Sequence, residues 1–313
     1  MNILVTGSIA YDTIMVFPDR FKNHLLADQL HILNVCFLTP EMRREFGGTA
    51  GNIGHNLKLL GEDPLVMATV GEDIEPYVQR LRTAAIRTEL LRRIPGQFTA
   101  QAFITTDLDD NQITAFHPGA MNYSQENHVV PGLGAGIAII GPDGKEGMLQ
   151  HARECAAQGI PCLFDPGQGL PMFSPAEIVQ FLQWADFVAV NDYEGKLLEE
   201  KTGRTLEQIA ADVKALVYTL GAKGSVILAG GKRHEIPCVQ ADRVADPTGC
   251  GDAYRAGLLY GIAHGLDWPT TGKLAAVTGA IKIAFRGGQN HAPRRDEIEA
   301  RFRAAFGYSP WHG

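Results

Sequence analysis

Asp246-Pro-Thr-Gly-Cys-Gly-Asp-Ala-Tyr-Arg-Ala-Gly257 is the stretch around which the rest of the chain is organised. It combines a glycine-flanked turn, an acidic residue directly after the turn, and a run of small residues typical of a packed helix. A helix that begins near Gly249 leaves its first N–H groups without intrahelical partners, and Gly249 and Gly251 let this backbone approach a ligand closely. The stretch therefore predicts an anion hole at the start of a helix.

Asp252 lies in the first turn of the predicted helix, where the helix dipole favours an ionised carboxylate. A base would then stand beside a place where negative charge binds, so that an acceptor hydroxyl could lose its proton as a phosphoryl group arrives. The alternative is that Asp246 or Thr248 merely caps a helix and that Asp252 decorates its first turn. Two glycines around one residue, followed by an acid, exceed what a cap requires and favour catalysis.

The composition of the 313 residues is that of an ordinary globular protein, with 45% apolar and 20% charged residues. The net charge of -7 argues against nucleic-acid binding, because proteins with that function usually carry a basic surplus. We expect a cytoplasmic protein, since no apolar run approaches the roughly 20 residues that span a bilayer and the N-terminus has no leader pattern. The five cysteines fall in no metal-binding spacing.

Short apolar runs, each followed by a polar or glycine-rich loop, alternate with helical patterns and predict a mostly parallel sheet. Ligands of such sheets bind outside the carboxyl ends of the strands. Asp12 follows the first run and is expected there in a loop, where it either holds hydroxyl groups or is simply solvated. The runs are Ile3 to Val5, Leu65 to Val70, Ile137 to Ile140, Gly159 to Asp165, Phe187 to Val190, Leu216 to Leu220 and Ser225 to Ala229.

Two further segments predict a small accessory sheet. Short apolar pieces, such as Ile32-Leu33 and Val35 to Leu38, recur in the first segment, which runs from Met15 to Phe46. In the second, Gln97 to Thr106 and Gln112 to His117 flank a turn-forming cluster and predict a hairpin. We expect one domain over residues 1–313, with a discontinuous β lid from about 13–46 and 97–120 that excludes water from the ligand edge of the main sheet.

Three other stretches join glycine or acidic residues to a predicted strand end or helix start. They are Gly47-Gly48-Thr49-Ala50-Gly51-Asn52, Asn191-Asp-Tyr-Glu194 and Thr219-Leu-Gly221-Ala-Lys-Gly224. A glycine turn before a helix, a polar helix start and a glycine hairpin explain them when each is taken alone.

Together these stretches resemble the ribokinase-like (PfkB) kinase family in their order along the chain. The run from Asp246 to Asp252 is similar to the family signature Asp-Thr-x-Gly-Ala-Gly-Asp, although Pro247 shifts its opening and Cys250 stands where alanine is usual. The resemblance implies that Asp252 is the catalytic base and that the N–H groups of Gly249, Cys250 and Gly251 form the anion hole for the transferred phosphate. It also implies a three-layer α/β/α fold with a mostly parallel central sheet and a small β-sheet lid.

The resemblance further implies an acceptor site. Asp12 corresponds to a family residue that binds sugar hydroxyls, and the stretch with Gly47, Gly48 and Asn52 resembles the signature that brings bare backbone and one amide to the acceptor. The apolar residues of the lid that are candidates to cover a flat base are Phe37, Phe103, Phe116 and Met121.

For the phosphoryl donor, the resemblance implies ATP and Mg²⁺. Asn191 and Glu194 resemble an element that organises the metal and its waters, with Glu194 the important carboxylate. The loop at 286–290 is expected to approach the adenine and, in some family members, a monovalent cation. The residues of the ATP-binding turn are Thr219, Gly221 and Gly224.

The wording of the signatures is most similar to adenosine kinase-like members, which implies phosphorylation of the 5′-hydroxyl of a nucleoside, adenosine first. A sugar kinase of the ribose or fructose type and a broad nucleoside kinase are alternatives within the family. From other classes, a cysteine hydrolase or transferase using Cys250 and a non-catalytic nucleoside sensor stay open, although the intact Asp252 disfavours the sensor. The expected partners are small molecules, and an open edge of the lid sheet would allow a homodimer.

Overall fold

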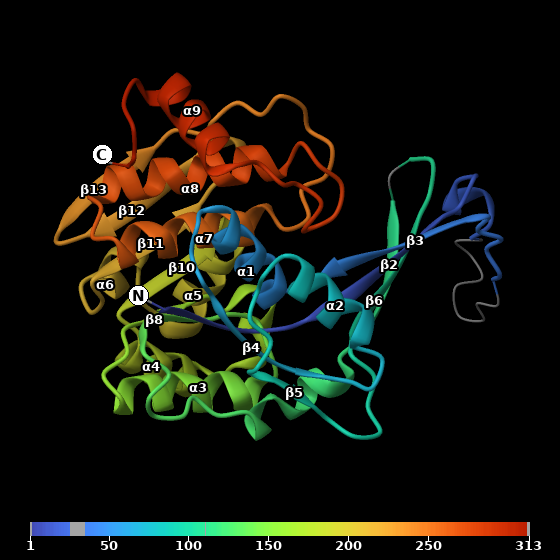
Figure 1. The fold of residues 1–313 in the computed structure, drawn as a ribbon, viewed down its shortest axis with the longest axis horizontal. Helices are drawn as coiled ribbons and strands as arrows, with labels where there is room; N and C mark the ends of the chain where they lie inside the picture. Colours follow the sequence, from blue (N-terminus) through green and yellow to red (C-terminus); the bar gives the residue numbers. More distant parts are fainter. Residues whose placement is uncertain (1, 26–34, 110, 312–313) are drawn as a thin grey trace.

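The computed structural model describes residues 2–25, 35–109 and 111–311, and in this part of the chain it forms a large and a small β-sheet (Figure 1). The large sheet has nine strands in the order β13-β12-β11-β10-β9-β8-β1-β4-β5. Neighbouring strands in this sheet are parallel, except for the pairs β11–β12 and β12–β13. This arrangement confirms the predicted mostly parallel sheet. The strands are β1 (Asn2–Thr6), β4 (Leu65–Val70), β5 (Leu91–Arg93), β8 (Ala135–Ile140), β9 (Cys162–Phe164), β10 (Phe187–Asn191), β11 (Ala215–Thr219), β12 (Ser225–Ala229) and β13 (Lys232–Ile236).

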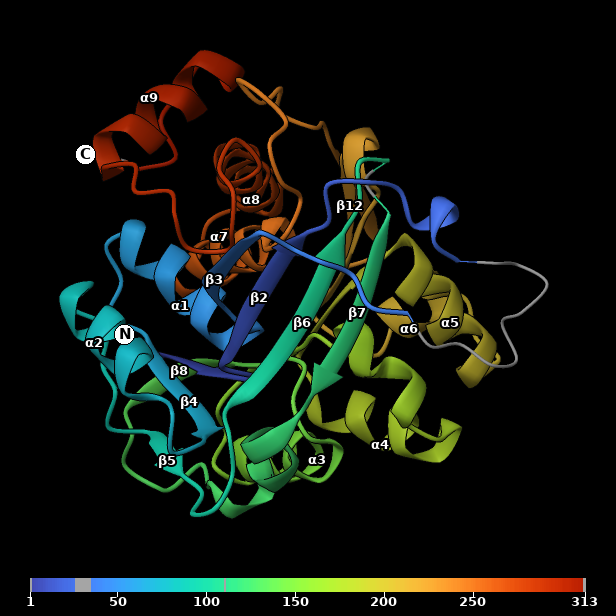
Figure 2. The same ribbon diagram turned by 90° about the vertical axis from the view of Figure 1, so that its right-hand side faces the viewer.

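Helices cover both faces of the large sheet, as the predicted three-layer fold requires (Figure 2). Successive residues of a strand point to opposite faces, so Ile3 and Val5 join the core under α1, α2, α7 and α8, whereas Leu4 joins the core under α3, α4, α5 and α6. The helices are α1 (Thr49–Leu59), α2 (Glu75–Thr83), α3 (Lys145–Ala157), α4 (Pro175–Trp184), α5 (Asp192–Thr202), α6 (Leu206–Ala210), α7 (Cys250–Ala263), α8 (Trp268–Lys282) and α9 (Arg295–Phe306), with 3₁₀ turns η1 (Phe21–Asn23), η3 (Gly119–Glu126), η4 (Gly167–Met172) and η5 (Gly221–Lys223).

The small sheet projects from one end of the body (Figure 1). Its strands run in the order β3-β2-β6-β7, with β2–β6 parallel and the other two pairs antiparallel. The predicted hairpin is confirmed as β6 and β7. The bounds are β2 (Ala10–Val16), β3 (Glu41–Gly47), β6 (Ala100–Thr106) and β7 (Gln112–His117).

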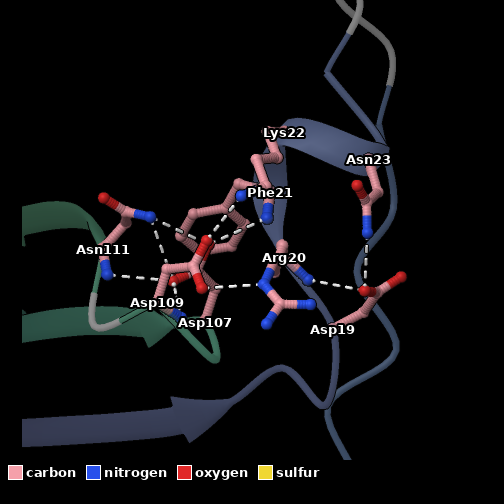
Figure 3. Close-up of polar contacts among 8 residues, drawn as sticks. All are labelled: Asp19, Arg20, Phe21, Lys22, Asn23, Asp107, Asp109 and Asn111. Atoms are coloured by element: carbon pink, nitrogen blue, oxygen red, sulfur yellow. Dashed lines mark hydrogen bonds and ion pairs between the residues drawn. The ribbon is translucent and has the colours of Figure 1, made fainter.

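A polar cluster ties the far end of this sheet together (Figure 3). The carboxylate of Asp107 accepts hydrogen bonds from the backbone N–H groups of Phe21, Asp109 and Asn111. These bonds hold the pKa of Asp107 near 2, against an opposing effect of burial, which is the largest single influence. Arg20 Nε lies 2.7 Å from Asp109 Oδ1, so hydrogen bonds and an ion pair together join the turn of the hairpin to the segment after β2.

Several predicted boundaries were wrong. The small sheet begins at Ala10, so Asp12 lies within β2 and not in a loop after β1. Residues 35–38 form no strand, and Ile32-Leu33 lies outside the described residues. No helix in the described part of the chain has both the length and the apolar character that a membrane span needs.

Candidate active site

The carboxyl ends of the parallel strands gather several of the predicted residues at one edge of the large sheet. Asp165 follows β9 directly, and Asn191 and Thr219 are the last residues of β10 and β11, where they pair in register. This is the edge at which open α/β sheets bind ligands.

Helix α7 begins with the predicted glycine turn. Gly249 is its N-cap residue with a φ of 77°, a left-handed conformation that glycine adopts without strain. The N–H of Cys250 donates to the carbonyl of Pro247 at 3.1 Å, so this group is already used within the turn. Among the described residues the N–H groups of Gly249 and Gly251 have no acceptor, and a Cβ added at Gly251 would meet open space. Two of the three predicted donors are therefore available to an anion.

Asp252 lies in the first turn of α7 and contacts α1. The side-chain amide of Asn52 donates to Asp252 Oδ2 at 2.8 Å, although the two residues are 200 positions apart in the sequence. Burial is the largest cause that raises the pKa of Asp252, to about 7, and the nearby charges of Asp165 and Asp12 act in the same direction. Removal from water therefore opposes the effect that the position of Asp252 in the first turn of α7 was expected to have on its carboxylate.

A buried network fixes the orientation of Asn52. Gln289 donates from Nε2 to Asn52 Oδ1 at 3.1 Å and to the hydroxyl of Tyr77 at 2.5 Å. Tyr77 in turn donates to the carbonyl of Gly47 at 2.6 Å. The oxygen of the Asn52 amide is thus engaged, which leaves its N–H₂ group to face Asp252. Neither Gln289 nor Tyr77 lies in one of the glycine-rich signatures, although Gln289 belongs to the loop at 286–290 that was expected to approach the adenine.

Asp12 faces the same region from β2 of the small sheet. Burial, followed by the charges of Asp246 and Glu45, raises the pKa of Asp12 to about 6. A Cβ added at Gly47 would lie 2.5 Å from Asp12 Oδ2, and one added at Gly48 would lie 2.5 Å from the carbonyl oxygen of Ser8. Gly48, with a φ of 84°, is therefore required where the start of α1 approaches the backbone before β2, whereas the close contact at Gly47 is with the end of the Asp12 side chain.

A buried ion pair lies one turn further along α7 from Asp252. Arg255, one turn after Asp252 on α7, donates from Nε and Nη2 to the two carboxylate oxygens of Asp165 at 3.1 and 3.2 Å. Both side chains are almost completely buried. This pairing directs the guanidinium of Arg255 into the interior.

Asn191 and Glu194 form a reciprocal cap at the start of α5. The N–H and side-chain amide of Asn191 each donate to Glu194 at 2.8 Å, and the N–H of Glu194 donates to Asn191 Oδ1 at 2.7 Å. The alternative of a polar helix start thus describes the local geometry. Burial and the charge of Asp165 raise the pKa of Glu194, which places this carboxylate beside the Asp165–Arg255 pair.

Thr219, Gly221 and Gly224 lie in the hairpin between β11 and β12, as the alternative interpretation predicted. A Cβ at Gly224 would lie 2.1 Å from the carbonyl oxygen of Ile236, so only glycine fits at this position. The hydroxyl groups of Ser225 and Tyr254 hydrogen-bond at 2.6 Å and join this hairpin to α7.

The register of the small sheet divides its aromatic residues between two faces. Residues directly opposite one another project on the same side, so the pairs Asp12–Ala102 and Ala102–Phe116 place Phe116 on the face of Asp12. Phe103, one position after Ala102, lies on the opposite face. Phe37 packs against Phe17 and Phe21 with ring centroids 4.9 and 5.0 Å apart, which makes it part of the lid's own core. Met121 lies in η3, which packs against α3.

Replacement of Cys250 by alanine should lower kcat by less than about tenfold, which corresponds to a rise of less than about 1.4 kcal/mol in the activation free energy. Burial is the largest cause that raises the pKa of the Cys250 thiol, to about 11, so little of the nucleophilic thiolate exists at neutral pH. Steady-state assay of Cys250→Ala beside Cys238→Ala, which changes an exposed thiol away from α7, tests this. A Cys250→Ala variant that binds both substrates but does not turn over would instead establish a cysteine nucleophile.

Known proteins resemble the chain over most of its length. A model of the family described as "pfkB family carbohydrate kinase" matches residues 9–295. A nucleoside kinase of Methanocaldococcus jannaschii is 32% identical over 270 residues, which cover 86% of this chain and 89% of that protein.

Solved structures of a nucleoside kinase also resemble the chain over nearly its whole length. The nucleoside kinase of Burkholderia thailandensis in complex with inosine is 52% identical and superposes with a TM-score of 0.89, covering 98% of this chain and 99% of that one. The structure of the same protein in complex with ADP-inosine, also 52% identical, has a TM-score of 0.88 and covers 99% and 98% of the two chains.

Proposed function

Because the chain belongs to the pfkB family of carbohydrate kinases, we propose that it transfers the γ-phosphoryl group of ATP to the 5′-hydroxyl of a nucleoside, adenosine among them. The observation that carries the proposal is the position of Asp252, which lies beside the free N–H groups at the start of α7 and is oriented by Asn52. The related nucleoside kinase with inosine widens the expected acceptor from adenosine alone to several nucleosides.

The reaction needs a base, an anion hole and alignment, and no covalent intermediate. Asp252 accepts the proton of the 5′-hydroxyl as the hydroxyl oxygen forms its bond to the γ-phosphorus. The bond from that phosphorus to the bridging oxygen of ADP breaks in the same displacement. The N–H groups of Gly249 and Gly251 donate to the phosphoryl oxygens, whose charge they stabilise.

Magnesium fits this site as an ion held mainly by phosphate oxygens and water. Among the described residues no three His, Cys, Asp or Glu side chains form a cluster able to hold a metal by themselves. Mg²⁺ in kinases commonly uses one or two carboxylates and several waters, and Glu194 offers such a carboxylate close to Asp165. When bound, the ion would neutralise charge on the phosphates. Asn191 keeps the Glu194 carboxylate in place through their reciprocal cap.

We place the nucleotide between the hairpin with Thr219, Gly221 and Gly224 and the start of α7. The hydrogen bond between Ser225 and Tyr254 supports this placement, because it fixes the hairpin to the helix that carries the anion hole. The ATP phosphates would then extend toward Gly249 and Asp252.

For the acceptor, we assign the ribose hydroxyls to Asp12 and Asn52 and the base to the lid. Phe116 is on the same face as Asp12, with 51% of its surface exposed. Ile14 and Ile104 share this face, since they pair in register two residues further along β2 and β6. These side chains offer a flat base an apolar surface that a free sugar does not use.

We therefore expect nucleosides to have a kcat/KM at least about tenfold higher than ribose or fructose, since burial of an aromatic face is worth a few kcal/mol. A panel of adenosine, inosine, guanosine, cytidine, ribose and fructose, assayed with the same MgATP concentration, measures this. The matched variants are Phe116→Ala and Phe103→Ala, because Phe103 is similarly exposed, at 41%, but lies on the opposite face.

Phe116→Ala should lower kcat/KM for nucleosides more than for ribose, whereas Phe103→Ala should affect neither. Preference of the parent enzyme for free sugars would contradict the nucleoside assignment and leave a sugar kinase. Equal use of several nucleosides would identify a broad nucleoside kinase and not an adenosine kinase.

We also propose a homodimer formed through the lid. All six residues of β7 are exposed and the strand lies at an edge of the small sheet, so its free N–H and C=O groups are open to a second chain. Light scattering after size-exclusion chromatography should give the mass of two chains, and Thr114→Pro, which prevents edge pairing, should shift it toward one. A parent protein with the mass of one chain at all concentrations would contradict the dimer.

A further inference from the structure

Lys282 is a lysine with no exposed surface, at the last position of α8. Its Nζ donates to the carbonyl oxygen of Asp246 at 2.8 Å and to that of Phe285 at 3.1 Å. Fully buried lysines are rare unless they are paired, because removing an ammonium group from water is costly. Two main-chain carbonyls at hydrogen-bond distance therefore indicate a position that the fold requires to be cationic.

The two carbonyls belong to the segments on either side of the proposed phosphate site. Asp246 opens the turn that ends in the anion hole, and Phe285 opens the loop at 286–290. Three further hydrogen bonds join this region. The side-chain Oδ2 of Asp246 accepts from the N–H of Gly287 at 2.8 Å, and two backbone bonds run from the N–H groups of Ala245 and Asp246 to Ile283 O. Lys282 is the positive charge within this junction.

Carbonyl oxygens near a carboxylate are also the ligands that a hard cation selects. The loop at 286–290 was expected to approach a monovalent cation, and such an ion does not fit between the carbonyls of Asp246 and Phe285, since the ammonium of Lys282 already lies there. Burial is the largest influence on Lys282 and lowers the pKa of its ammonium, while the nearby charges of Asp246 and Asp252 act in the opposite direction and oppose its deprotonation.

We propose that the ammonium of Lys282 is a built-in replacement for a monovalent cation, which positions the anion-hole turn and makes phosphoryl transfer independent of K⁺ or Na⁺. Lys282 is a positioning residue: it acts through the Asp246 carbonyl and the turn that follows. The inference rests on the proposed kinase activity for its kinetic test, but its structural test does not.

The kinetic test compares the parent, Lys282→Ala and Lys273→Ala with MgATP and a nucleoside in tetramethylammonium, sodium, potassium or ammonium chloride at equal ionic strength. Lys273 is on the same helix, and its ammonium lies over the rings of Phe306 and Tyr308, so its loss is a matched control. The parent and Lys273→Ala should have the same kcat in all four salts. Lys282→Ala should lose at least about tenfold in kcat and recover part of it in potassium or ammonium, which can fill the vacated place between the carbonyls.

A parent enzyme that needs potassium, a Lys282→Ala variant as active as the parent, or a folded Lys282→Ala variant that no cation restores would each overturn the proposal. The structural test needs only the parent protein. Crystals soaked in rubidium chloride should show no anomalous peak beside the carbonyl oxygens of Asp246 and Phe285. A peak there would overturn the proposal even if the acceptor assignment were correct, or if Lys282→Ala failed to fold.

Discussion

Replacement of Asp252 by asparagine should lower kcat by about 10²- to 10⁴-fold while nucleotide binding and folding are retained. The substitution removes the base and keeps its shape. The carbonyl oxygen of the new amide can still accept the 2.8 Å hydrogen bond from Asn52, so the contact between α1 and α7 is preserved. Single-turnover assays of phosphoryl transfer, with nucleotide binding measured separately by calorimetry, check both parts of this result.

The matched control is Asp267→Asn, which makes the same chemical change at the N-cap of the neighbouring helix α8. Asp267 accepts a hydrogen bond from the N–H of Thr270, and asparagine caps helices equally well. Its kcat should equal that of the parent. Turnover by Asp252→Asn near the parent rate would exclude Asp252 as the base, and the same activity in both variants would favour a catalytic group elsewhere in the site.

The pH dependence follows from the same residue. Burial raises the pKa of Asp252 to about 7, so the carboxylate is ionised above this pH and protonated below it. Since the base must be ionised, kcat/KM for the parent should fall as pH decreases through about 7. The residual activity of Asp252→Asn should not show this fall, and an identical acid limb in both proteins would assign it to another group.

Replacement of Arg255 by methionine should lower the free energy of unfolding by about 3 to 5 kcal/mol. The side chain of methionine fills much of the space, but it leaves the buried carboxylate of Asp165 without its two charged hydrogen bonds. Urea unfolding followed by circular dichroism measures the change. Arg294→Met is the control, because Arg294 is 72% exposed and pairs with the exposed Asp296, and loss of such a pair costs about 0 to 1 kcal/mol.

A second substitution separates charge from packing. Asp165→Asn in the Arg255→Met background removes the uncompensated charge and should restore part of the lost stability. If the double variant is no more stable than Arg255→Met, the loss comes from packing. If Arg255→Met unfolds at the same urea concentration as Arg294→Met, the buried pair contributes no more than a surface pair.

The sequence predicted most of the large sheet well because those strands are buried on both faces, whereas β5 and β13 are largely exposed and no apolar run marks them. The run of buried apolar residues in β4, from Leu65 to Val70, is distinct from its polar surroundings. The strands of the small sheet were located less well. β3 contains the charged run Glu41-Met-Arg-Arg-Glu45 and is largely solvated, so no apolar pattern marks it. Asp12, which pairs with Glu45 in register, was expected in a loop because it follows closely the apolar run of β1, with only a short link between β1 and β2.

The site was predicted where its residues stand in motifs and missed where they meet only in the folded chain. Asn52 and Asp252 each lie in a glycine-rich signature, and the structure brings them into contact. Tyr77 and Lys282 carry no local signal, because a helix residue becomes recognisable only through distant partners. Burial of Asp252 is likewise a property of the whole fold, so the rise in its pKa could not be read from its position in the helix.

The central position of β1 affects how the chain is made on the ribosome. β1 is synthesised first, but its two neighbours are β4 and β8, so one of its edges stays open until residues 135–140 have left the exit tunnel. The unpaired N–H and C=O groups along one edge of this interior strand are then exposed during that part of translation, a state open to aggregation or to capture by a holdase chaperone. Only after β8 has been synthesised can β1 pair along both of its edges.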